Sequence, residues 1–323
     1  MSNVTANGAT SAALTVLRGV NKDLGVVQQQ VSSGLRIKNA SDDPTYWSMA
    51  TTMRSDQSSL STINDALGLG SSKVDTASTA MDTVVGLLTQ IQSKLVSAKE
   101  PGTDKTAINA DIQQLKNQLQ SVTQSASFSN ENWLYNTEAH PTTQQSVISN
   151  FTRGTGGQIS LATIGYDSSQ TLMIDTADAS RGLLTKNVDA STSSGGGAAS
   201  RNYYLLAAAG GTPPAGGTEI AISSTTTDDQ LNDMLNVTNS LLKSATSAGS
   251  TLGMMKSNID DQADYISKLT DSIKSSVGDM VDTNMEEAAA RQSALQTAQQ
   301  MGVQALSIAN GMASKVLIIL QAK

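Results

Sequence analysis

Apolar residues recur at alternating spacings of three and four over most of the chain, a pattern typical of helices that pack as coiled coils. The first run comprises Ala13, Leu17, Val20, Leu24, Val27 and Val31. The second run comprises Leu60, Ile63, Leu67, Gly70, Val74, Ala77, Met81, Val84, Leu88, Ile91, Leu95 and Ala98. It predicts a long helix that ends at Glu100-Pro101-Gly102. A third helix is predicted after it, with Ile108, Ile112, Leu115, Leu119, Val122 and Ala126 on one face.

The C-terminal part of the chain repeats this pattern. Its run comprises Leu231, Met234, Leu241, Ala245, Ala248, Leu252, Met255, Ile259, Ile266, Leu269, Ile273 and Met280, with Thr238, Gln262 and Ser276 at polar positions. Asp228 and Asp229 stand where the N-cap of this helix is expected. A last helix is predicted from Met285 to Leu320. It becomes apolar on nearly all sides, so other helices must enclose it.

The pattern changes between residues 137 and 227, where Gly, Ser and Thr increase and the heptads disappear. Short β-like runs replace them: QSVISNFT, QISLATIGY, TLMIDT, NYYLLA and EIAISS. The Gly-rich run GTGGQIS at 154–160 is interpreted as a hairpin turn. These features predict a mainly α fold with a β-rich insertion at the far end of a long antiparallel coiled-coil stalk, and with both termini together at the other end.

The predicted segments follow from these patterns. They are an N-terminal helix and joint (1–43), N-terminal stalk helices (44–136), a β-containing middle domain (137–227), a C-terminal stalk helix (228–282) and a C-terminal helix (283–323).

Composition narrows the possible functions. Aromatic residues are only 3% of the chain, which favours long thin helices over a thick globular core. The net charge of −7 and the lack of a basic patch argue against a nucleic-acid partner. The N-terminal residues do not resemble a cleavable secretory signal. The most apolar run, Val316 to Leu320, is far shorter than the roughly 20 residues of a membrane span, so no membrane partner is expected.

The sequence offers little for catalysis. There is no Cys, and the sole histidine, His140, stands in a predicted loop without a visible catalytic partner. The phosphate-binding, dinucleotide-binding and zinc-protease motifs are absent. The acidic pairs, such as Asp42-Asp43 and Asp260-Asp261, are interpreted as helix starts and solvated faces. We therefore expect no enzyme, no cofactor and no metal site.

The surplus of apolar residues near the C-terminus has a different implication. Residues 301–320, MGVQALSIANGMASKVLIIL, present more apolar side chains than one helix pair can bury. The N-terminal helix, rich in Ser, Thr, Asn and Gly, is marginal in isolation. Both ends are therefore expected to order on association with other copies, as in a self-assembling subunit.

Three segments resemble the bacterial flagellins. They are VSSGLRIKNASDD (31–43), SFSNENWL (127–134) and MEEAAARQSALQTAQQMGVQALSIAN (285–310). With the helices around them, they extend the resemblance over about 1–135 and 228–323, while the middle third carries no match. The resemblance implies a subunit of the extracellular flagellar filament, which is secreted through the flagellum-specific type III export apparatus.

The same resemblance implies an arrangement and a set of partners. The two termini of flagellins form an inner tube, the long helices form an outer tube, and the middle segment faces solvent. The implied partners are other copies, a filament cap, hook-junction proteins and an export chaperone at the C-terminal helix, about 285–320. A filament mixed with related flagellins, as in some alphaproteobacteria, fits the pattern as well. The alternatives are a hook–filament junction protein of the same superfamily and a helical-hairpin signalling protein.

Residues 31–49 are interpreted as the joint between the inner and outer helices. Gly34 allows a turn, and Asp43 with Pro44 starts the next helix. Leu35 and Ile37 are expected to pack inward, whereas Arg36, Lys38 and Asp42 are expected to meet neighbouring subunits. The predicted assembly contacts are Leu17, Val20, Leu24, Val27, Val31, Leu35, Arg36, Ile37, Asp42, Asp43, Tyr46, Trp47, Leu295, Val303, Leu306, Ile308, Met312, Val316 and Ile319.

Two departures from the family pattern stand out. Tyr46 and Trp47 replace small residues that the family usually has. Such large side chains need a neighbouring group that covers them. The family's immune-receptor run, Arg-x-Arg-Glu-Leu, falls on residues 90–95, where both Arg and the Glu are absent. This predicts weak recognition by the vertebrate flagellin receptor.

Overall fold

The computed structural model describes residues 8–139, 141, 144–154, 157–190, 201–207 and 213–321, with side chains from residue 10 to residue 311. His140 lies outside the described residues. The chain divides into two compact units, each described by itself. The terminal unit consists of residues 1–58 and 270–323, and the central unit consists of residues 59–269.

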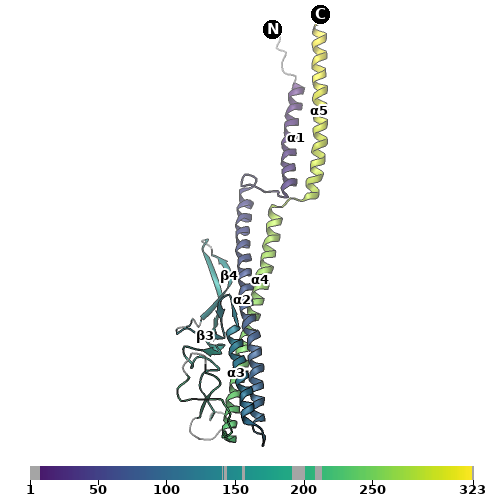
Figure 1. Ribbon diagram of the computed structural model, residues 1–323. Helices are drawn as coiled ribbons and strands as arrows, with labels where there is room; N and C mark the ends of the chain where they lie inside the picture. The colour runs from purple at the N-terminus through teal and green to yellow at the C-terminus, as the bar shows by residue number, and fades with distance from the viewer. Residues whose placement is uncertain are drawn as a thin grey trace. The chain divides into compact units, whose positions relative to one another are not determined.

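Five α-helices account for most of the described chain, which confirms the predicted mainly α fold (Figure 1). They are α1 (Gly8–Ser33), α2 (Pro44–Ser97), α3 (Lys105–Ser125), α4 (Asp228–Val281) and α5 (Met285–Gln321). In the terminal unit α1 and α5 run side by side in opposite directions (Figure 1).

The strands lie between α3 and α4 and are mostly short. They are β1 (Ser127–Phe128), β2 (Glu131–Asn132), β3 (Tyr135–Asn136), β4 (Gln144–Arg153), β5 (Ile159–Asp167), β6 (Ile174–Asp175), β7 (Val188–Asp189), β8 (Asn202–Tyr204) and β9 (Thr218–Glu219), with a 3-10 turn at Ser168–Gln170. β1 pairs with β2 and β4 with β5, both antiparallel, while β3 and β6 are parallel. β7, β8 and β9 form the remaining sheet. Each predicted β-like run contains or borders one of these strands.

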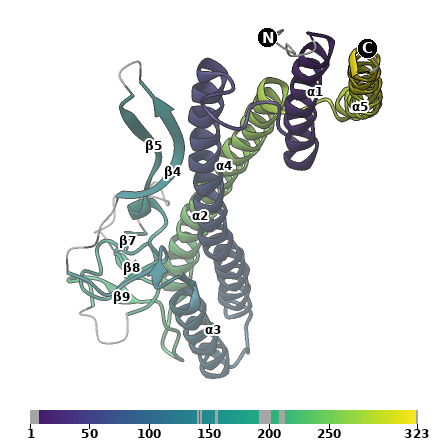
Figure 2. The ribbon, with the colours of Figure 1, turned by 90° about the horizontal axis from the view of Figure 1, so that it is seen from above.

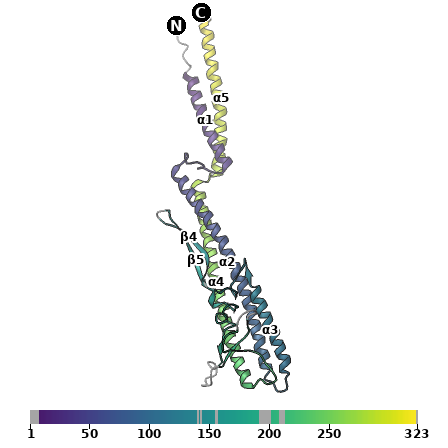
Figure 3. The ribbon, with the colours of Figure 1, turned by 60° about the vertical axis from the view of Figure 1, so that its left-hand side comes forward.

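The core of the central unit is the seam between α2 and α4. All the predicted seam positions of α2 from Leu60 to Ile91, and Leu95 too, are buried. Gly249 of α4 lies so close to Met81 that an added Cβ would stand 3.3 Å from Met81 Cγ. Lys256 Nζ pairs with Asp75 Oδ2 at 3.1 Å beside this seam, and the order of the two contacts along the helices shows that α2 and α4 are antiparallel. α3 packs beside this pair in the same unit (Figure 3).

The β-rich insertion packs along the sides of these helices, whereas the sequence analysis placed it at their far end. A Cβ on Gly70 would lie 2.6 Å from Val147 Cγ1, so the absence of a side chain lets β4 rest directly on α2 (Figure 2). Further along, the buried Lys116 of α3 donates to Glu219 of β9 at 2.8 Å. Burial lowers the pKa of Lys116, and the hydrogen bond from its ammonium to Glu219 opposes that shift.

The start of α4 corrects one sequence prediction. Asp228 and Asp229 are not the N-cap but the first two helical residues, where their charge favours the positive end of the helix dipole. The cap is Thr227, whose Oγ1 accepts the backbone N–H of Gln230 at 3.3 Å. Gln230 Oε1 in turn accepts the N–H of Thr227 at 3.0 Å, which completes a capping box.

Exposed faces of the helices carry many Ser and Thr hydroxyls that bond to the chain's own backbone. Thr51 donates to the carbonyl oxygen of Trp47 at 2.8 Å, and Thr89 to that of Val85 at 2.9 Å. Thr251 and Ser293 make the same bond to the residue four positions earlier. These polar side chains are therefore satisfied within their own helices.

Candidate functional site

The joint predicted at residues 31–49 forms a set of backbone contacts inside the terminal unit. Gly34 follows α1 with φ +72°, a left-handed conformation that a side chain disfavours. Leu35 then forms an antiparallel bridge with Asp282. The backbone N–H of Arg36 donates to the carbonyl oxygen of Val281 at 2.7 Å. The turn after α1 is thereby attached to the end of α4.

A small apolar cluster lies beneath this bridge. Ile37 is buried with Ala50, Val277 and Val281, and half-buried side chains including Leu35 pack against them. The predicted inward packing of Leu35 and Ile37 is confirmed by this cluster.

The polar residues of the joint bond within their own chain. Arg36 Nη2 donates to the carbonyl oxygen of Met280 at 2.9 Å. Asp42 Oδ2 accepts the N–H groups of Asn39 at 2.9 Å and Lys38 at 3.0 Å. These two donors hold the pKa of Asp42 below its usual range. Arg36 and Asp42 therefore stabilise the joint itself, a role that the sequence analysis did not foresee.

The start of α2 follows the sequence prediction. Asp43 Oδ1 accepts the backbone N–H of Thr45 at 3.0 Å and that of Tyr46 at 3.1 Å, and Pro44 is the first helical residue. The cap orients the first turn so that Tyr46 and Trp47 are exposed, together with Met49. Their own chain covers these three large side chains only in part and leaves between 38% and 49% of each exposed.

The α1–α5 pair buries part of the predicted assembly set inside the subunit. Leu24 and Val27 of α1 are buried, and Leu17 is close enough to Gly302 that an added Cβ would stand 3.1 Å from Leu17 Cδ1. Gln299 Nε2 donates to Asn21 Oδ1 at 2.7 Å beside this contact. Five further predicted positions of the pair are half-buried: Leu17, Val20, Val31, Leu295 and Leu306.

Other apolar side chains of this pair remain exposed. Val303 and Ile308, both predicted contacts, are exposed, as is Met301. On α1, Val16 and Val26 are exposed as well, although they lie outside the heptad seam from which contacts were predicted. In the sequence, the seven-residue spacing of Met301 and Ile308 could have indicated a second apolar stripe on this helix. Met312, Val316 and Ile319 lie outside the described side chains.

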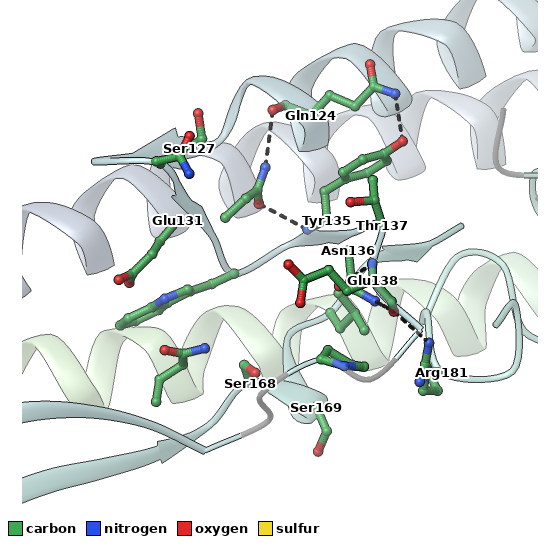
Figure 4. Close-up of a pocket in the computed structure, with 16 residues that line it drawn as sticks. Gln124, Ser127, Glu131, Tyr135, Asn136, Thr137, Glu138, Ser168, Ser169 and Arg181 are labelled. Atoms are coloured by element: carbon green, nitrogen blue, oxygen red, sulfur yellow. Dashed lines mark hydrogen bonds between the residues drawn. The ribbon is translucent and has the colours of Figure 1, made fainter. Parts of the chain in front are cut away.

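A cavity of about 700 Å³ lies in the central unit (Figure 4). Two charged residues of its lining form ion pairs within the chain: Glu131 pairs with Lys73 at 2.7 Å, and Arg181 pairs with the buried Asp175 at 2.7 Å. Gln124 Nε2 donates to the hydroxyl of Tyr135 at 3.1 Å across one wall (Figure 4). Neither histidine nor cysteine is among the described residues that line this cavity.

The segment SFSNENWL forms one edge of this cavity. It folds as the β1–β2 hairpin, in which Phe128 pairs with Glu131. Ser129 and Asn130 both have positive φ, at 51° and 66°, as a type I′ turn requires. The segment that resembles the flagellin pattern therefore forms a tight turn after α3.

No group of three or more acidic, His or Cys side chains in the described ranges could hold a metal ion. No described helix is long and apolar enough to cross a membrane.

Comparison with known proteins identifies the two helical ends. Residues 4–139 match the bacterial flagellin N-terminal helical region, and residues 235–320 match the bacterial flagellin C-terminal helical region. The chain is similar to flagellin C of Rhizobium meliloti (strain 1021), with 46% identity over 99% of this chain and 100% of that protein. It is 34% identical to flagellin A of the same strain over 98% of this chain and 99% of that protein. It is also 34% identical to a flagellin of Brucella melitensis biotype 1, over 98% of each chain.

Proposed function

The chain belongs to the bacterial flagellin family and is a structural subunit of the flagellar filament, and we propose that the exposed flanks of its α1–α5 pair drive its polymerisation. One observation carries the proposal: α5 keeps apolar side chains exposed after it has packed against α1. Leaving such side chains in water is unfavourable, and a neighbouring copy can cover them.

The positions of these side chains on α5 support contacts on both sides. At about 100° per residue, Met301 and Ile308 lie on one flank of the seam that faces α1, and Val303 lies on the other. Each subunit therefore offers exposed apolar side chains to a neighbour on either side, as a closed tube of helices requires. The half-buried Leu17, Val20, Leu295 and Leu306 border this seam and extend the contact.

The joint provides a second assembly surface in this proposal. Tyr46 and Trp47 are exposed at the start of α2, and the rigid cap at Asp43 holds them in place. Arg36 and Asp42 act indirectly, because their hydrogen bonds fix the joint that presents the aromatic pair.

The roles of the segments follow from the same proposal. Residues 1–43 and 283–323 form the inner tube, residues 44–136 and 228–282 form the outer tube, and residues 137–227 face solvent. The filament is extracellular, and the subunit reaches it through the flagellar type III export apparatus. An export chaperone covers the exposed apolar residues of α5 before assembly, and the filament cap and hook-junction proteins meet the subunit at the filament ends. Related flagellins share the filament.

The test is seeded polymerisation of the purified full-length chain on short filament fragments, observed by electron microscopy. Long helical filaments are expected, and discrete oligomers would refute the proposal. Removing residues 1–30 or 300–323 should abolish polymerisation while circular dichroism still reports a helical central unit. Truncated chains that still form filaments would overturn the role of the helix pair.

Point variants of α5 test the polymerisation proposal more specifically. Met301→Ser with Ile308→Ser should raise the critical concentration for polymerisation at least tenfold, because one flank of α5 loses its apolar stripe. Val96→Ser is the matched control, since Val96 is an exposed apolar residue of the central unit outside the proposed contacts. Equal effects of the two changes would contradict the proposal.

A further inference from the structure

The methionines of this chain differ widely in exposure. The chain contains no cysteine, so methionine thioethers are its only sulfur groups. Several are inside the packed helices and the insertion and are buried: Met81, Met173, Met234 and Met255. Four others are exposed large apolar side chains: Met254 (60%), Met301 (59%), Met49 (49%) and Met285 (47%). An oxidant in solution therefore reaches the sulfur atoms of these four residues before those of the buried ones.

Two of the four exposed methionines belong to the surfaces proposed for assembly. Met301 stands seven residues before the exposed Ile308 on α5, which places both side chains on the same flank of that helix. Met49 stands three residues after Tyr46 on α2, so these two side chains are neighbours on one helix face. Each of the two proposed surfaces thus carries one oxidisable side chain.

Oxidation changes the chemical character of such a side chain. A peroxide transfers one oxygen atom to the thioether sulfur, which gives up two electrons. The O–O bond breaks, an S–O bond forms, and hydrogen peroxide leaves as water. The thioether is apolar, whereas the sulfoxide that replaces it is polar and chiral. A polar group that is buried against apolar side chains loses its water without gaining a partner, which disfavours the contact.

We propose that Met49 and Met301 are modification sites whose oxidation to the sulfoxide blocks polymerisation of the free subunit. The inference rests on the proposed function, because it assigns a regulation to the same two surfaces. Both side chains are exposed in the separate chain, where a peroxide reaches them. A neighbouring copy that covers them in the filament keeps the peroxide away. Oxidation therefore acts on subunits before they are incorporated, and the filament protects these two residues.

The modification is reversible, so it works as a switch. Two methionine sulfoxide reductases, one for each sulfoxide epimer, return the thioether. A dithiol supplies the two electrons: the S–O bond breaks, the dithiol becomes a disulfide, and the oxygen leaves as water. The exposure that admits a peroxide to Met49 and Met301 gives these reductases access as well.

The test compares two pairs of methionines that match in exposure. Met254 and Met285 are as exposed as Met301 and Met49, and they lie outside the proposed contacts. One full-length variant carries Met49→Leu with Met301→Leu, and the control variant carries Met254→Leu with Met285→Leu. These two chains and the reference chain all carry Met312→Leu, because the side chain of Met312 lies outside the described ones.

Each unpolymerised chain is treated with hydrogen peroxide, which catalase then removes. The treatment stops when mass spectrometry finds the exposed methionines oxidised and the half-buried Met53 and Met280 still reduced. Circular dichroism checks that the fold of each treated chain is intact. The critical concentration for seeded polymerisation is then divided by that of the same chain before treatment.

We expect this ratio to be at least ten for the reference chain and for the control variant. It should be below two for the variant without Met49 and Met301. Treating the oxidised reference chain with both reductases and dithiothreitol should return its ratio to below two. In preformed filaments of the reference chain, peroxide should oxidise Met301 at least fivefold more slowly than in the free chain.

The outcomes separate this inference from the proposed function. An untreated reference chain that forms no filaments overturns both. Filaments that form equally well before and after oxidation overturn the redox inference and leave the filament function standing. The same conclusion follows if the two variants are inhibited equally, or if Met301 is oxidised as fast in filaments as in the free chain.

Discussion

Thr283 donates its backbone N–H to the carbonyl oxygen of Gly34 at 2.9 Å, which joins the second residue after α4 to the first residue after α1. α1 and α4 end beside this bond, and α5 begins two residues after Thr283. The positive φ of Gly34 is what turns its carbonyl toward Thr283, so the joint depends on a residue without a side chain.

Substituting Gly34 tests this dependence. Gly34→Val should destabilise the terminal unit by about 1–2 kcal/mol, because a β-branched side chain disfavours the left-handed region. Gly34→Asn should cost less, since Asn adopts that region more readily. The measurement is urea-induced unfolding of the unpolymerised chain. Equal costs for the two variants would mean that the conformation at Gly34 is not the cause.

The apolar cluster under the joint leads to a second prediction. Ile37→Ala should lower the free energy of unfolding of the terminal unit by about 2–4 kcal/mol, because it leaves a cavity among Ala50, Val277 and Val281. Lys38→Ala, at the exposed neighbouring position, should stay within about 0.5 kcal/mol of wild type. Amide hydrogen exchange at residues 31–50 reports the change locally. Unaltered exchange in Ile37→Ala would contradict the role of the cluster.

The third prediction concerns Tyr46 and Trp47, and it compares their effect on assembly with their effect on stability. Tyr46→Ser combined with Trp47→Ser should lower the free energy of unfolding of the unpolymerised chain by about 1–2 kcal/mol, because each side chain is partly covered by its own chain. The critical concentration for polymerisation should rise at least tenfold. Thr45→Ser serves as the neighbouring control. Wild-type polymerisation of the double variant would remove Tyr46 and Trp47 from the assembly surface.

A buried carboxylate in the central unit predicts a pH dependence. Burial by itself raises the pKa of Asp175, but Arg181, the N–H groups of Asp178 and Ala177, and Asn136 outweigh it and hold the pKa below its usual range. A depressed pKa in the folded state stabilises the fold above the unfolded value of about 3.9, and this stability is lost as pH falls through the folded value. Asp175→Asn should therefore cost about 3 kcal/mol at pH 7 and progressively less below pH 4.

Urea unfolding of the unpolymerised chain at a series of pH values measures this difference. Asp65→Asn, at an exposed position of α2, is the control and should change stability little at any pH. A cost for Asp175→Asn that stays constant down to about pH 2 would show that its charge is not responsible.

The immune-receptor segment gives a prediction outside assembly. Ile91 and Leu95 are buried, and the exposed positions around them carry Gln90 and Ser93 in place of an Arg-rich run. The purified monomer should activate reporter cells for the vertebrate flagellin receptor only weakly, compared with a flagellin that has the Arg-x-Arg-Glu-Leu run. Full-strength activation would refute this prediction.

Local features of this fold were predictable from sequence because they depend on residues close together in the chain. The α2 seam followed from a single spacing rule, and the helix start at Asp43-Pro44 followed from capping chemistry. The cap at Thr227 was missed because two acidic residues beside it gave a competing N-terminal signal. The capping box is recognised only when the hydrogen bonds between Thr227 and Gln230 are known.

Contacts between distant segments were not predictable in the same way. No pattern in the sequence places Val147 against Gly70, because that contact depends on how the insertion folds back on α2. The β-bulge after Ile148 interrupts the strand alternation. A strict two-residue alternation in the sequence therefore wrongly assigns Ile148 and Phe151 to opposite faces of the β4–β5 hairpin. The intramolecular hydrogen bonds of Arg36 and Asp42 were not predicted either. The sequence alone does not distinguish a charged side chain that bonds within the joint from one that contacts a neighbouring subunit.

The hydroxyl groups that bond to their own helix backbones affect how these subunits can associate. A polar side chain loses free energy on burial when it gives up water without gaining a partner. Thr51, Thr89 and Thr251 already have their donors satisfied within the helix, so a neighbouring copy can exclude water from them at little cost. The helix faces thus remain polar enough for a dispersed monomer and yet can be dehydrated in a polymer. Such surfaces suit a protein that must exist first as separate chains and afterwards as a tightly packed fibre.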